Sequence, residues 1–496
     1  MKKIYILLSL LSVMSFISSC YVDKGNYEYT TISDILIDGF DDTYVLKSLV
    51  DTLVVNPIVS TDYPKEDLEY NWIIYDSKNE RDTISDEPNL SYFITKAPGN
   101  YTLFYYVYNK NNGYYNFTRT KLEVGTLFSR GHYLLKETEN GNTDLDLYIA
   151  EGEKLDNIIT NTYGSSISGS PRSMGILYDK SMINPDNNEK TNAHSLGIIT
   201  YNDVIEVYRA SDMRKVFDKE SLFYEKHSAT PYKFLTGVWN NDYISSDGLF
   251  FTSTRNQESG KFGFPRGESG GSDKIAYSET FLAAVYWDEH SKRIIHTNYN
   301  SQATVLVSDQ FPTSGMDYEC MAMVNCRGAV YGLFKDNTKT SAYKLYRIYA
   351  SRFSRVPKVQ SVVELDSSYG LVSARLFAGN EKTAQMIYFV KDNSLFYFDV
   401  TSNREYAVEI PGIAPGEEIT YISNRHYNLT SPAFDYFVVA TYKDSVYKLY
   451  MYNMVGGLPV GEPIHYVTGS GKIKEVHYLS YTFDSFYMFM GSGYSR

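Results

Sequence analysis

The chain has 496 residues, more than one hydrophobic core usually serves, so we expect two or more domains. Its 47 basic and 59 acidic residues give a net charge of −12, which argues against nucleic acid and against an anionic membrane surface as partners. Three cysteines are few for a secreted protein. Composition therefore predicts an acidic, multidomain protein that does not depend on disulfides.

The N-terminus has the pattern of a lipoprotein signal peptide. Two lysines precede an apolar run from Ile4 to Ile17, which is shorter than the ~18 apolar residues that suggest a membrane-spanning helix. Two serines and then Cys20 suit a lipoprotein signal peptidase, which makes Cys20 the acylated first residue. We therefore predict a signal peptide over residues 1–19 and a lipid-anchored tether over residues 20–29. The alternative is ordinary secretion with an unmodified thiol at Cys20.

The segment from residue 30 to 125 has the pattern of an immunoglobulin-like (Ig-like) β-sandwich. Strand-like alternation surrounds Trp72, and a Pro-Gly turn at 98–99 precedes a long aromatic strand. Asn-Asn-Gly at 111–113 then gives a hairpin turn into the next strand. A Trp on a middle strand and a Tyr soon after a turn are typical of Ig-like sandwiches of about 100 residues.

The same residues carry a family resemblance. Tyr-x-Trp at 70–72, followed by Pro-Gly-x-Tyr-Thr-Leu at 98–103, resembles polycystic-kidney-disease (PKD) repeats. Cys-x-x-Asp-Lys-Gly-Asn-Tyr at 20–27 is similar to the start of the PKD-like lipoproteins of Bacteroidetes, and the resemblance covers residues 20–125. It implies an outer-membrane lipoprotein at the cell surface, whose partners are a TonB-dependent transporter of the starch-utilisation type and its SusD-like lipoprotein. The resemblance implies location and partners more than chemistry.

After residue 125 a hairpin unit recurs, with an apolar strand, a polar turn rich in Asp, Asn or Lys, and an aromatic strand. Seven units over residues 126–496 give about 53 residues each, near the ~40 to 50 of known blade repeats. We therefore predict an all-β chain whose second part is a seven-bladed β-propeller. The alternative is a pair of stacked sandwiches, since no WD or kelch signature is present. The hairpins are expected at His132–Ile149, Leu196–Tyr208, Tyr243–Thr254, Leu282–His296, Val330–Tyr349, Met386–Val400 and Tyr436–Tyr452.

Two Gly- and Ser-rich stretches, 161–175 and 258–273, interrupt the hairpins and are predicted to be long loops at a propeller mouth, either binding lids or flexible insertions. Cys320 and Cys326 are an even pair, either bridged or two buried thiols. A ligand site on the propeller would combine aromatic with charged side chains, although the tryptophans would equally pack between blades. The candidates are Trp239, Tyr243, Arg255, Arg266, Tyr286, Trp287 and Arg375.

The sequence lacks the motifs of phosphate-binding and zinc enzymes. No glycine-rich phosphate loop follows a strand, and the eight histidines form no His-Glu-x-x-His pattern, so we expect no metal, no cofactor and no catalytic residues. The expected function is that of a surface lipoprotein that binds a glycan or peptide nutrient, or a partner protein, as an accessory of TonB-dependent uptake. Two alternatives stay open, a propeller-fold polysaccharide lyase or hydrolase with a site assembled across blades, and a structural assembly subunit.

Overall fold

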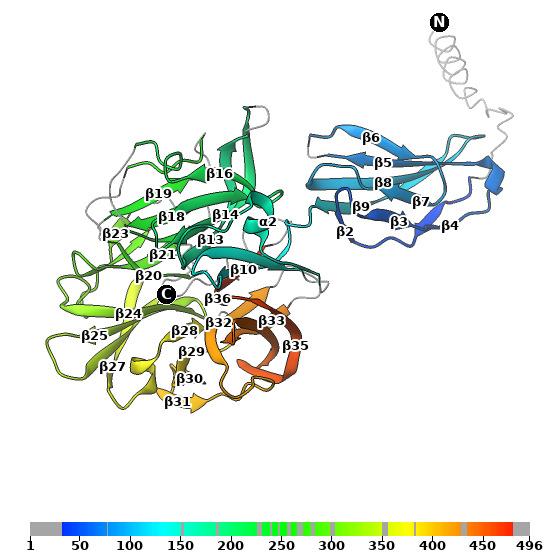
Figure 1. The fold of residues 1–496 in the computed structure, drawn as a ribbon. Coiled ribbons are helices and arrows are strands. Elements are labelled where there is room, and N and C mark those ends of the chain that lie inside the picture. The colour runs from blue at the N-terminus through cyan, green and yellow to red at the C-terminus, as the bar shows by residue number, and fades with distance from the viewer. Residues whose placement is uncertain are drawn as a thin grey trace, which may run out of the picture. The chain divides into compact units, whose positions relative to one another are not determined.

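A computed structural model describes residues 32–479 apart from short internal stretches. The predicted signal peptide, Cys20 and the whole predicted tether lie outside the described residues. The chain is almost entirely β-structure and divides into two compact units, the first ending at residue 121 and the second consisting mainly of residues 122–496 (Figure 1). The internal stretches left out are 77, 150–152, 185–187, 226–230, 239–240, 247–248, 255–258, 265–270, 279–282, 298–302, 350–355, 381–382 and 428–433.

The N-terminal strands form a β-sandwich. One sheet has five strands in the order β2-β9-β8-β5-β6, and two further pairs are β1-β4 and β3-β7. A short 3-10 helix, η1 (Lys65–Asp67), leads into β5. The strands are β1 (Leu36–Asp38), β2 (Thr43–Lys47), β3 (Thr52–Val55), β4 (Ile58–Ser60), β5 (Leu68–Tyr75), β6 (Arg81–Ser85), β7 (Leu90–Phe93), β8 (Gly99–Asn109) and β9 (Tyr115–Gly125).

The sandwich core is centred on Trp72 of β5 and Tyr105 of β8, which are cross-strand partners. Both side chains are fully buried, and their ring centroids lie 4.2 Å apart. The Trp72 indole donates to the Glu87 carbonyl at 2.8 Å, and the Tyr105 hydroxyl donates to the Pro88 carbonyl at 3.1 Å. These bonds satisfy the polar ends of two rings whose bodies fill the core. The Ig-like prediction is confirmed.

Seven sheets follow among the described residues, and we number them as blades 1 to 7. Blade 1 consists of β36 (Lys472–Leu479), β10 (Gly131–Glu137), β11 (Thr143–Tyr148) and β12 (Lys154–Leu155). Blade 2 consists of β13 (Pro171–Ile183), β14 (Lys190–Thr200), β15 (Ile205–Arg209) and β16 (Arg214–Asp218). Blade 3 has β17 (Tyr232–Val238), β18 (Asn241–Ser246) and β19 (Leu249–Thr254). Blade 4 has β20 (Gly271–Ser278), β21 (Ala283–Asp288), β22 (Arg293–Thr297) and β23 (Ala303–Val305).

The remaining blades complete the set. Blade 5 consists of β24 (Tyr318–Cys326), β25 (Ala329–Asp336), β26 (Ala342–Tyr349) and β27 (Lys358–Asp366). Blade 6 consists of β28 (Leu376–Gly379), β29 (Met386–Lys391), β30 (Ser394–Asp399) and β31 (Arg404–Ala407). Blade 7 consists of β32 (Glu418–Tyr427), β33 (Phe434–Lys443), β34 (Val446–Val455) and β35 (Leu458–Ser470). Two short helices, α2 (Ile158–Tyr163) and η2 (Gly370–Ser373), join blades.

The seven hairpins predicted from the sequence are the second and third strands of the seven blades. Their turns use residues that tolerate positive φ. Lys391 pairs with Ser394 across Asp392 and Asn393, which have φ values of 48° and 58°. Two such residues in a two-residue hairpin loop are the pattern of a type I′ turn, whose twist matches that of the strands. The Asp- and Asn-rich turns therefore serve local backbone geometry.

The innermost strands of the blades form a closed ring. They contact one another in the order β36, β13, β17, β20, β24, β28, β32 and back to β36. The ring closes because the last strand of the described chain, β36, pairs with β10 of the first hairpin (Figure 1). Seven sheets around a closed inner ring make this part a seven-bladed propeller, as predicted. The sequence did not reveal that blade 1 combines strands from both ends of the propeller.

Apolar cores lie between neighbouring blades, and the described residues form one such cluster at each of the seven junctions. Glycines let the inner strands approach closely. A Cβ at Gly379 of β28 would lie 1.6 Å from the Asn325 carbonyl oxygen, and one at Gly175 of β13 would lie 2.1 Å from the Leu235 carbonyl oxygen. Neither position has room for any side chain.

The prediction of a long loop over residues 161–175 is wrong. Residues 161–175 include the end of α2 and the first residues of β13, so more than half of that stretch is regular structure. The second stretch, 258–273, lies partly outside the described residues. Within it, Phe262 is fully buried between blades 2 and 3 and exchanges backbone hydrogen bonds with the 222–224 segment. Glycine and serine content alone therefore overestimated both loops.

Candidate functional site

The outer face of the five-stranded sheet carries a continuous set of aromatic rings. Because side chains alternate along a strand, the strand positions that flank the buried Tyr105 point to the opposite face of the sheet. Long aromatic stretches of β8 and β9 therefore give one buried and one outward-facing row. We call the outward set the aromatic face, which consists of Tyr75, Phe104, Tyr106, Tyr108, Tyr115 and Phe117.

Tyr106 is at the centre of the aromatic face. Its ring lies 5.8 Å from Phe104 and 5.9 Å from Tyr108, with interplanar angles of only 11° and 19°. Across to β9, its ring lies 5.2 Å from Phe117 and 6.4 Å from Tyr115. Three rings of β8 are therefore nearly parallel and evenly spaced, with two more rings beside them.

The aromatic face is partly exposed to solvent, and its six rings carry no charge. Tyr115 is 52% exposed and Phe117 is 45% exposed, whereas the β8 rings are half-buried by their neighbours. Burial raises the pKa of Tyr106, the neighbouring tyrosines add to that rise, and the Arg81 guanidinium at the sheet edge opposes it. Tyr106 therefore stays neutral at physiological pH. Exposed aromatic clusters of this kind mark interaction sites more often than isolated exposed rings do.

In the propeller, a rim of charged side chains lies where the inner strands of blades 6, 7 and 1 begin. Arg375 precedes β28, Glu418 begins β32, and Lys472 begins β36. The Glu418 carboxylate lies 2.8 Å from Lys472 Nζ and 3.9 Å from Arg375 Nη1. Arg375 also donates to the Asn393 side chain at 3.0 Å and to the Ile419 carbonyl at 2.5 Å. Arg375 thus connects blades 6 and 7 at this rim, and Glu418 lies near enough to offset its charge.

The other described candidates lie in the interior. Tyr243, Tyr286 and Trp287 are all buried between blades. The Trp287 ring packs edge-on against Phe334 of blade 5 at 5.1 Å. Tyr243 exchanges a 3.2 Å hydrogen bond with the Thr297 hydroxyl, and burial raises the pKa of Tyr243 to about 12. The structure therefore brings these three side chains into inter-blade cores and does not gather them with Arg375.

Three further candidates, Trp239, Arg255 and Arg266, lie outside the described residues. Their proposed role in ligand binding stays a prediction.

The suggested disulfide is not present in the structure, since Cys320 and Cys326 are free, buried thiols of β24. A register shift between Cys320 and Ala322 interrupts the regular alternation of β24. As a result, Cys320 packs in the core between blades 4 and 5, whereas Cys326 packs in the core between blades 5 and 6. The two sulfurs lie on opposite faces of one sheet and cannot meet. Burial raises the pKa of both thiols, which makes them poor nucleophiles.

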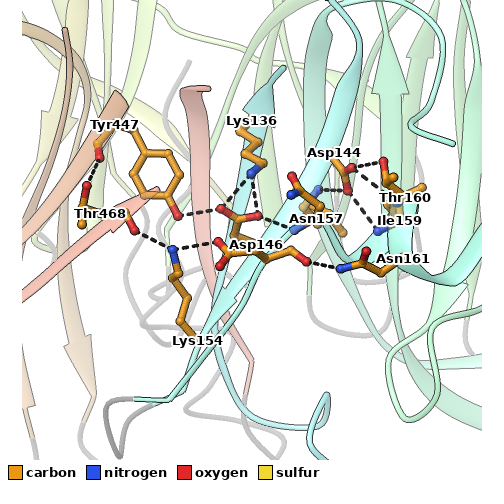
Figure 2. A network of polar contacts seen from close by, with 12 residues as sticks. Lys136, Asp144, Asp146, Lys154, Asn157, Ile159, Thr160, Asn161, Tyr447 and Thr468 are labelled. Atoms are coloured by element: carbon orange, nitrogen blue, oxygen red, sulfur yellow. Dashed lines mark hydrogen bonds and ion pairs between the residues drawn. The ribbon is translucent and has the colours of Figure 1, made fainter. Parts of the chain in front are cut away.

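A buried ion pair of blade 1 is hydrogen-bonded to a tyrosine of blade 7 (Figure 2). Lys136 Nζ lies 2.7 Å from the Asp146 carboxylate, and the two side chains are 1% and 0% exposed. The Tyr447 hydroxyl of blade 7 donates to the same carboxylate at 2.6 Å, and the Asn157 backbone N–H donates at 2.7 Å. Burial raises the pKa of Asp146, against the opposing effect of Lys136 and the two other donors.

Other buried charges are also neutralised within the chain. Lys180 of β13 lies 2.8 Å from Asp242 of β18 and donates to the Gly260 carbonyl at 2.7 Å. The Glu417 carboxylate accepts bonds from Lys448, from the Thr441 hydroxyl at 2.8 Å and from the Tyr450 hydroxyl at 3.1 Å. The Lys180–Asp242 pair connects blade 2 to blade 3, whereas the bonds of Glu417 connect it to β33 and β34 within blade 7. In the described part of the chain, no group of three or more His, Cys, Asp or Glu side chains is placed to hold a metal ion.

Histidines join aromatic clusters in blades 1 and 7. His465 of β35 shares a 3.1 Å hydrogen bond with the Tyr148 hydroxyl, and its ring meets Tyr436 edge-on at 5.8 Å. Burial lowers the pKa of His465. His465 is therefore a neutral side chain that packs between Tyr148 and Tyr436.

Residues 20–171 match the PKD-like family. The PKD-like match begins at Cys20 and ends at the first residue of β13, so it covers the sandwich, the hairpin of β10 and β11, and α2. It extends beyond residue 125, where the resemblance recognised in the sequence ends. No curated protein matches the chain. No helix within the described residues is both long and apolar enough to cross a membrane.

Several solved structures also match the chain. One is a quinonprotein alcohol dehydrogenase-like protein from Bacteroides thetaiotaomicron, with 13% identity and a TM-score of 0.40 over 89% of this chain and 97% of that chain. An auxiliary nutrient binding protein from the same organism has 8% identity and a TM-score of 0.31, over 68% and 91%. BamB from Moraxella catarrhalis has 9% identity and a TM-score of 0.34, over 66% and 81%. Likenesses this remote carry no argument about function.

Sequence reasoning placed the ligand site on the propeller and missed the aromatic face. The signal was present in the sequence, because β8 reads Tyr-Thr-Leu-Phe-Tyr-Tyr-Val-Tyr over 101–108, with no polar residue between 103 and 108 to cover the outer side. A strand with one solvent-facing side normally alternates apolar with polar residues. Aromatic residues on both alternating sets indicate that both sides of this sheet carry rings.

Proposed function

We propose that the mature protein is an outer-membrane lipoprotein, acylated at Cys20 and exposed at the cell surface. There it binds a polymeric nutrient, either a glycan or a peptide, or a partner protein, as an accessory of a TonB-dependent uptake system. The lipoprotein signal pattern before Cys20 and the PKD-like match support the outer-membrane location and the association with an uptake system. Several acyl chains on one cysteine would hold the protein stably to a membrane.

The observation that carries the binding role is the aromatic face. An uncharged set of six rings on a rigid sheet offers a large contact area at low conformational cost, since each ring is already held by its neighbours. The buried carboxylates that we have described are paired with lysines in the propeller interior, which suits a scaffold role for that domain.

The proposal is tested with the acylated protein in its native membrane. We expect mass spectrometry to find a lipid on Cys20, protease treatment of intact cells to remove the protein, and affinity purification to recover a TonB-dependent transporter. A screen of the mature protein against glycans and peptides is expected to give at least one ligand. An unmodified N-terminus, or a protein with neither ligand nor transporter partner, would contradict the proposal.

A further inference from the structure

No described residue forms a hydrogen bond with the tyrosine hydroxyls of the aromatic face. In the described part of the chain, those of Tyr75, Tyr106, Tyr108 and Tyr115 make no hydrogen bond to another residue. On the same strand, the inward Tyr105 hydroxyl donates to a backbone carbonyl. The outward rings therefore combine free aromatic surface with free hydroxyl groups.

Asn71 adds a polar group beneath the rings. It is the cross-strand partner of Tyr106, so the two side chains share the outer side of the sheet. Its Oδ1 atom is buried and has no hydrogen-bond partner among the described residues. Such an acceptor normally has a partner, because leaving it without one is unfavourable. Because this atom is not exposed to solvent, a ligand that lies on the rings does not reach it.

The arrangement of the rings repeats. Phe104, Tyr106 and Tyr108 are nearly parallel at 5.8 and 5.9 Å, so similar rings recur at an equal spacing along the strand. An array of equal stacking surfaces suits a polymer of equal units, because every unit meets the same environment. The negative face of an aromatic ring also attracts the positively polarised C–H groups of a sugar ring.

We propose that the aromatic face binds a polysaccharide whose sugar rings carry no charge. This inference rests on the proposed function and names the polymer. Stacking uses the sugar C–H faces, while the free phenol groups exchange hydrogen bonds with sugar hydroxyls. The six rings carry no charge, and their cross-strand neighbours Glu69 and Arg81 are of opposite sign. The chain carries a net charge of −12, which disfavours acidic polymers. Rings that touch one another leave no slot for the side chains of a peptide, which recognition of a peptide would use for specificity.

The test is affinity electrophoresis of the mature protein in native gels. Each gel contains one soluble polysaccharide: amylopectin, xyloglucan, mixed-linkage β-glucan, galactomannan or arabinoxylan, with polygalacturonate as the acidic arm. We expect retardation by at least one neutral polymer and none by polygalacturonate. Tyr106→Ala is expected to weaken binding about tenfold, the factor that loss of one stacking surface produces.

Two variants control for folding and for general loss of tyrosine. Tyr106→Phe keeps the ring, so we expect it to retain most of the retardation even if Tyr106→Ala loosens the sandwich. Tyr406→Ala removes an exposed tyrosine from blade 6, where its ring stacks on Tyr397 at 5.1 Å, and is expected to leave binding unchanged.

Each outcome decides the inference. No retardation by any neutral polymer, retardation that Tyr106→Ala leaves intact, or a preference for polygalacturonate would overturn it. If a peptide or a transporter protein binds instead and Tyr106→Ala abolishes that binding, the polysaccharide inference fails while the proposed binding function stands. If nothing binds and no transporter co-purifies, both fail.

Discussion

On the outer face of the sandwich, tyrosines leave their hydroxyls without hydrogen bonds to described residues, whereas many tyrosines of the propeller are buried or partly buried at blade junctions and donate to carboxylates and carbonyls. Tyr447 donates to Asp146 at 2.6 Å, Tyr452 donates to the Pro411 carbonyl at 2.6 Å, and Tyr421 donates to the Val476 carbonyl at 3.0 Å. One residue type thus supplies structural hydrogen bonds in one region and a free surface in the other. The high tyrosine count, 48 residues, therefore reflects two separate needs.

The largest effect on the propeller side is expected from the buried ion pair. Lys136→Met leaves the Asp146 carboxylate without its cation in a site with no exposure, so we expect the free energy of unfolding in urea to fall by about 3–5 kcal/mol. Lys335→Met is the matched control, because Lys335 pairs with Glu319 at 3.8 Å with both side chains exposed, and its effect should stay below about 1 kcal/mol. Combining Lys136→Met with Asp146→Leu should recover only part of the loss, because the Tyr447 hydroxyl and the Asn157 N–H then lose their acceptor. Equal effects of the two single variants would show that burial does not set the strength of these pairs.

Removing one hydroxyl from each region sharpens the comparison. Tyr447→Phe deletes a donor to a buried carboxylate, so we expect a loss of about 1.5–3 kcal/mol of unfolding free energy. Tyr106→Phe deletes a hydroxyl that bonds to no described residue, and its effect on stability should lie within about 0.5 kcal/mol. Urea unfolding of both variants gives the two values. Similar losses would mean that the hydroxyls of the aromatic face have partners inside the protein.

The smallest effect concerns pH. Burial lowers the pKa of His296 and His465, so in the acid range the unfolded chain binds more protons than the folded one. Their contribution to stability is complete above the unfolded histidine pKa of about 6.5 and is lost as pH falls through the lowered folded values. The urea midpoint should drop less between pH 7.5 and pH 5 in His465→Gln than in the natural sequence, with His290→Gln, at an exposed turn, as control.

Polymer binding by the aromatic face should not follow that pH dependence, since its six rings include no histidine. A binding affinity that changes in parallel with the stability between pH 7.5 and pH 5 would link the site to the propeller histidines instead.

The fold was largely predictable because its signals are local. Trp72 with its neighbours marked the sandwich, and Asp- and Asn-containing turns such as Asp392-Asn393 marked every blade hairpin. The ring closure of β36 on β10 was not predictable, because it joins residues more than 300 positions apart and leaves no local pattern. The same limit explains the site. Tyr286 and Trp287 have the composition of a ligand site, but only the packing of blade 4 on its neighbours shows that they are buried.

The aromatic face could be assigned only in part from the sequence. Whether a tyrosine faces in or out follows from strand alternation, which fixes two sets on β8 but does not say which set is the core. The cross-strand pairing of Tyr105 with Trp72 decides it, and Tyr106 is then outward by one residue. A contact between distant strands was needed to turn an aromatic run into an assignable surface.

Tyrosine footprinting tests the central claim most directly. The mature protein is nitrated with tetranitromethane in the presence and absence of the polysaccharide that retards it most, and the modified residues are mapped by mass spectrometry. We predict that Tyr115, which is 52% exposed, and its neighbour Tyr108 are protected by the polymer, while the equally exposed Tyr466 of the propeller is not. Protection of Tyr466 with none at Tyr115 and Tyr108 would contradict the account and place the binding site on the propeller.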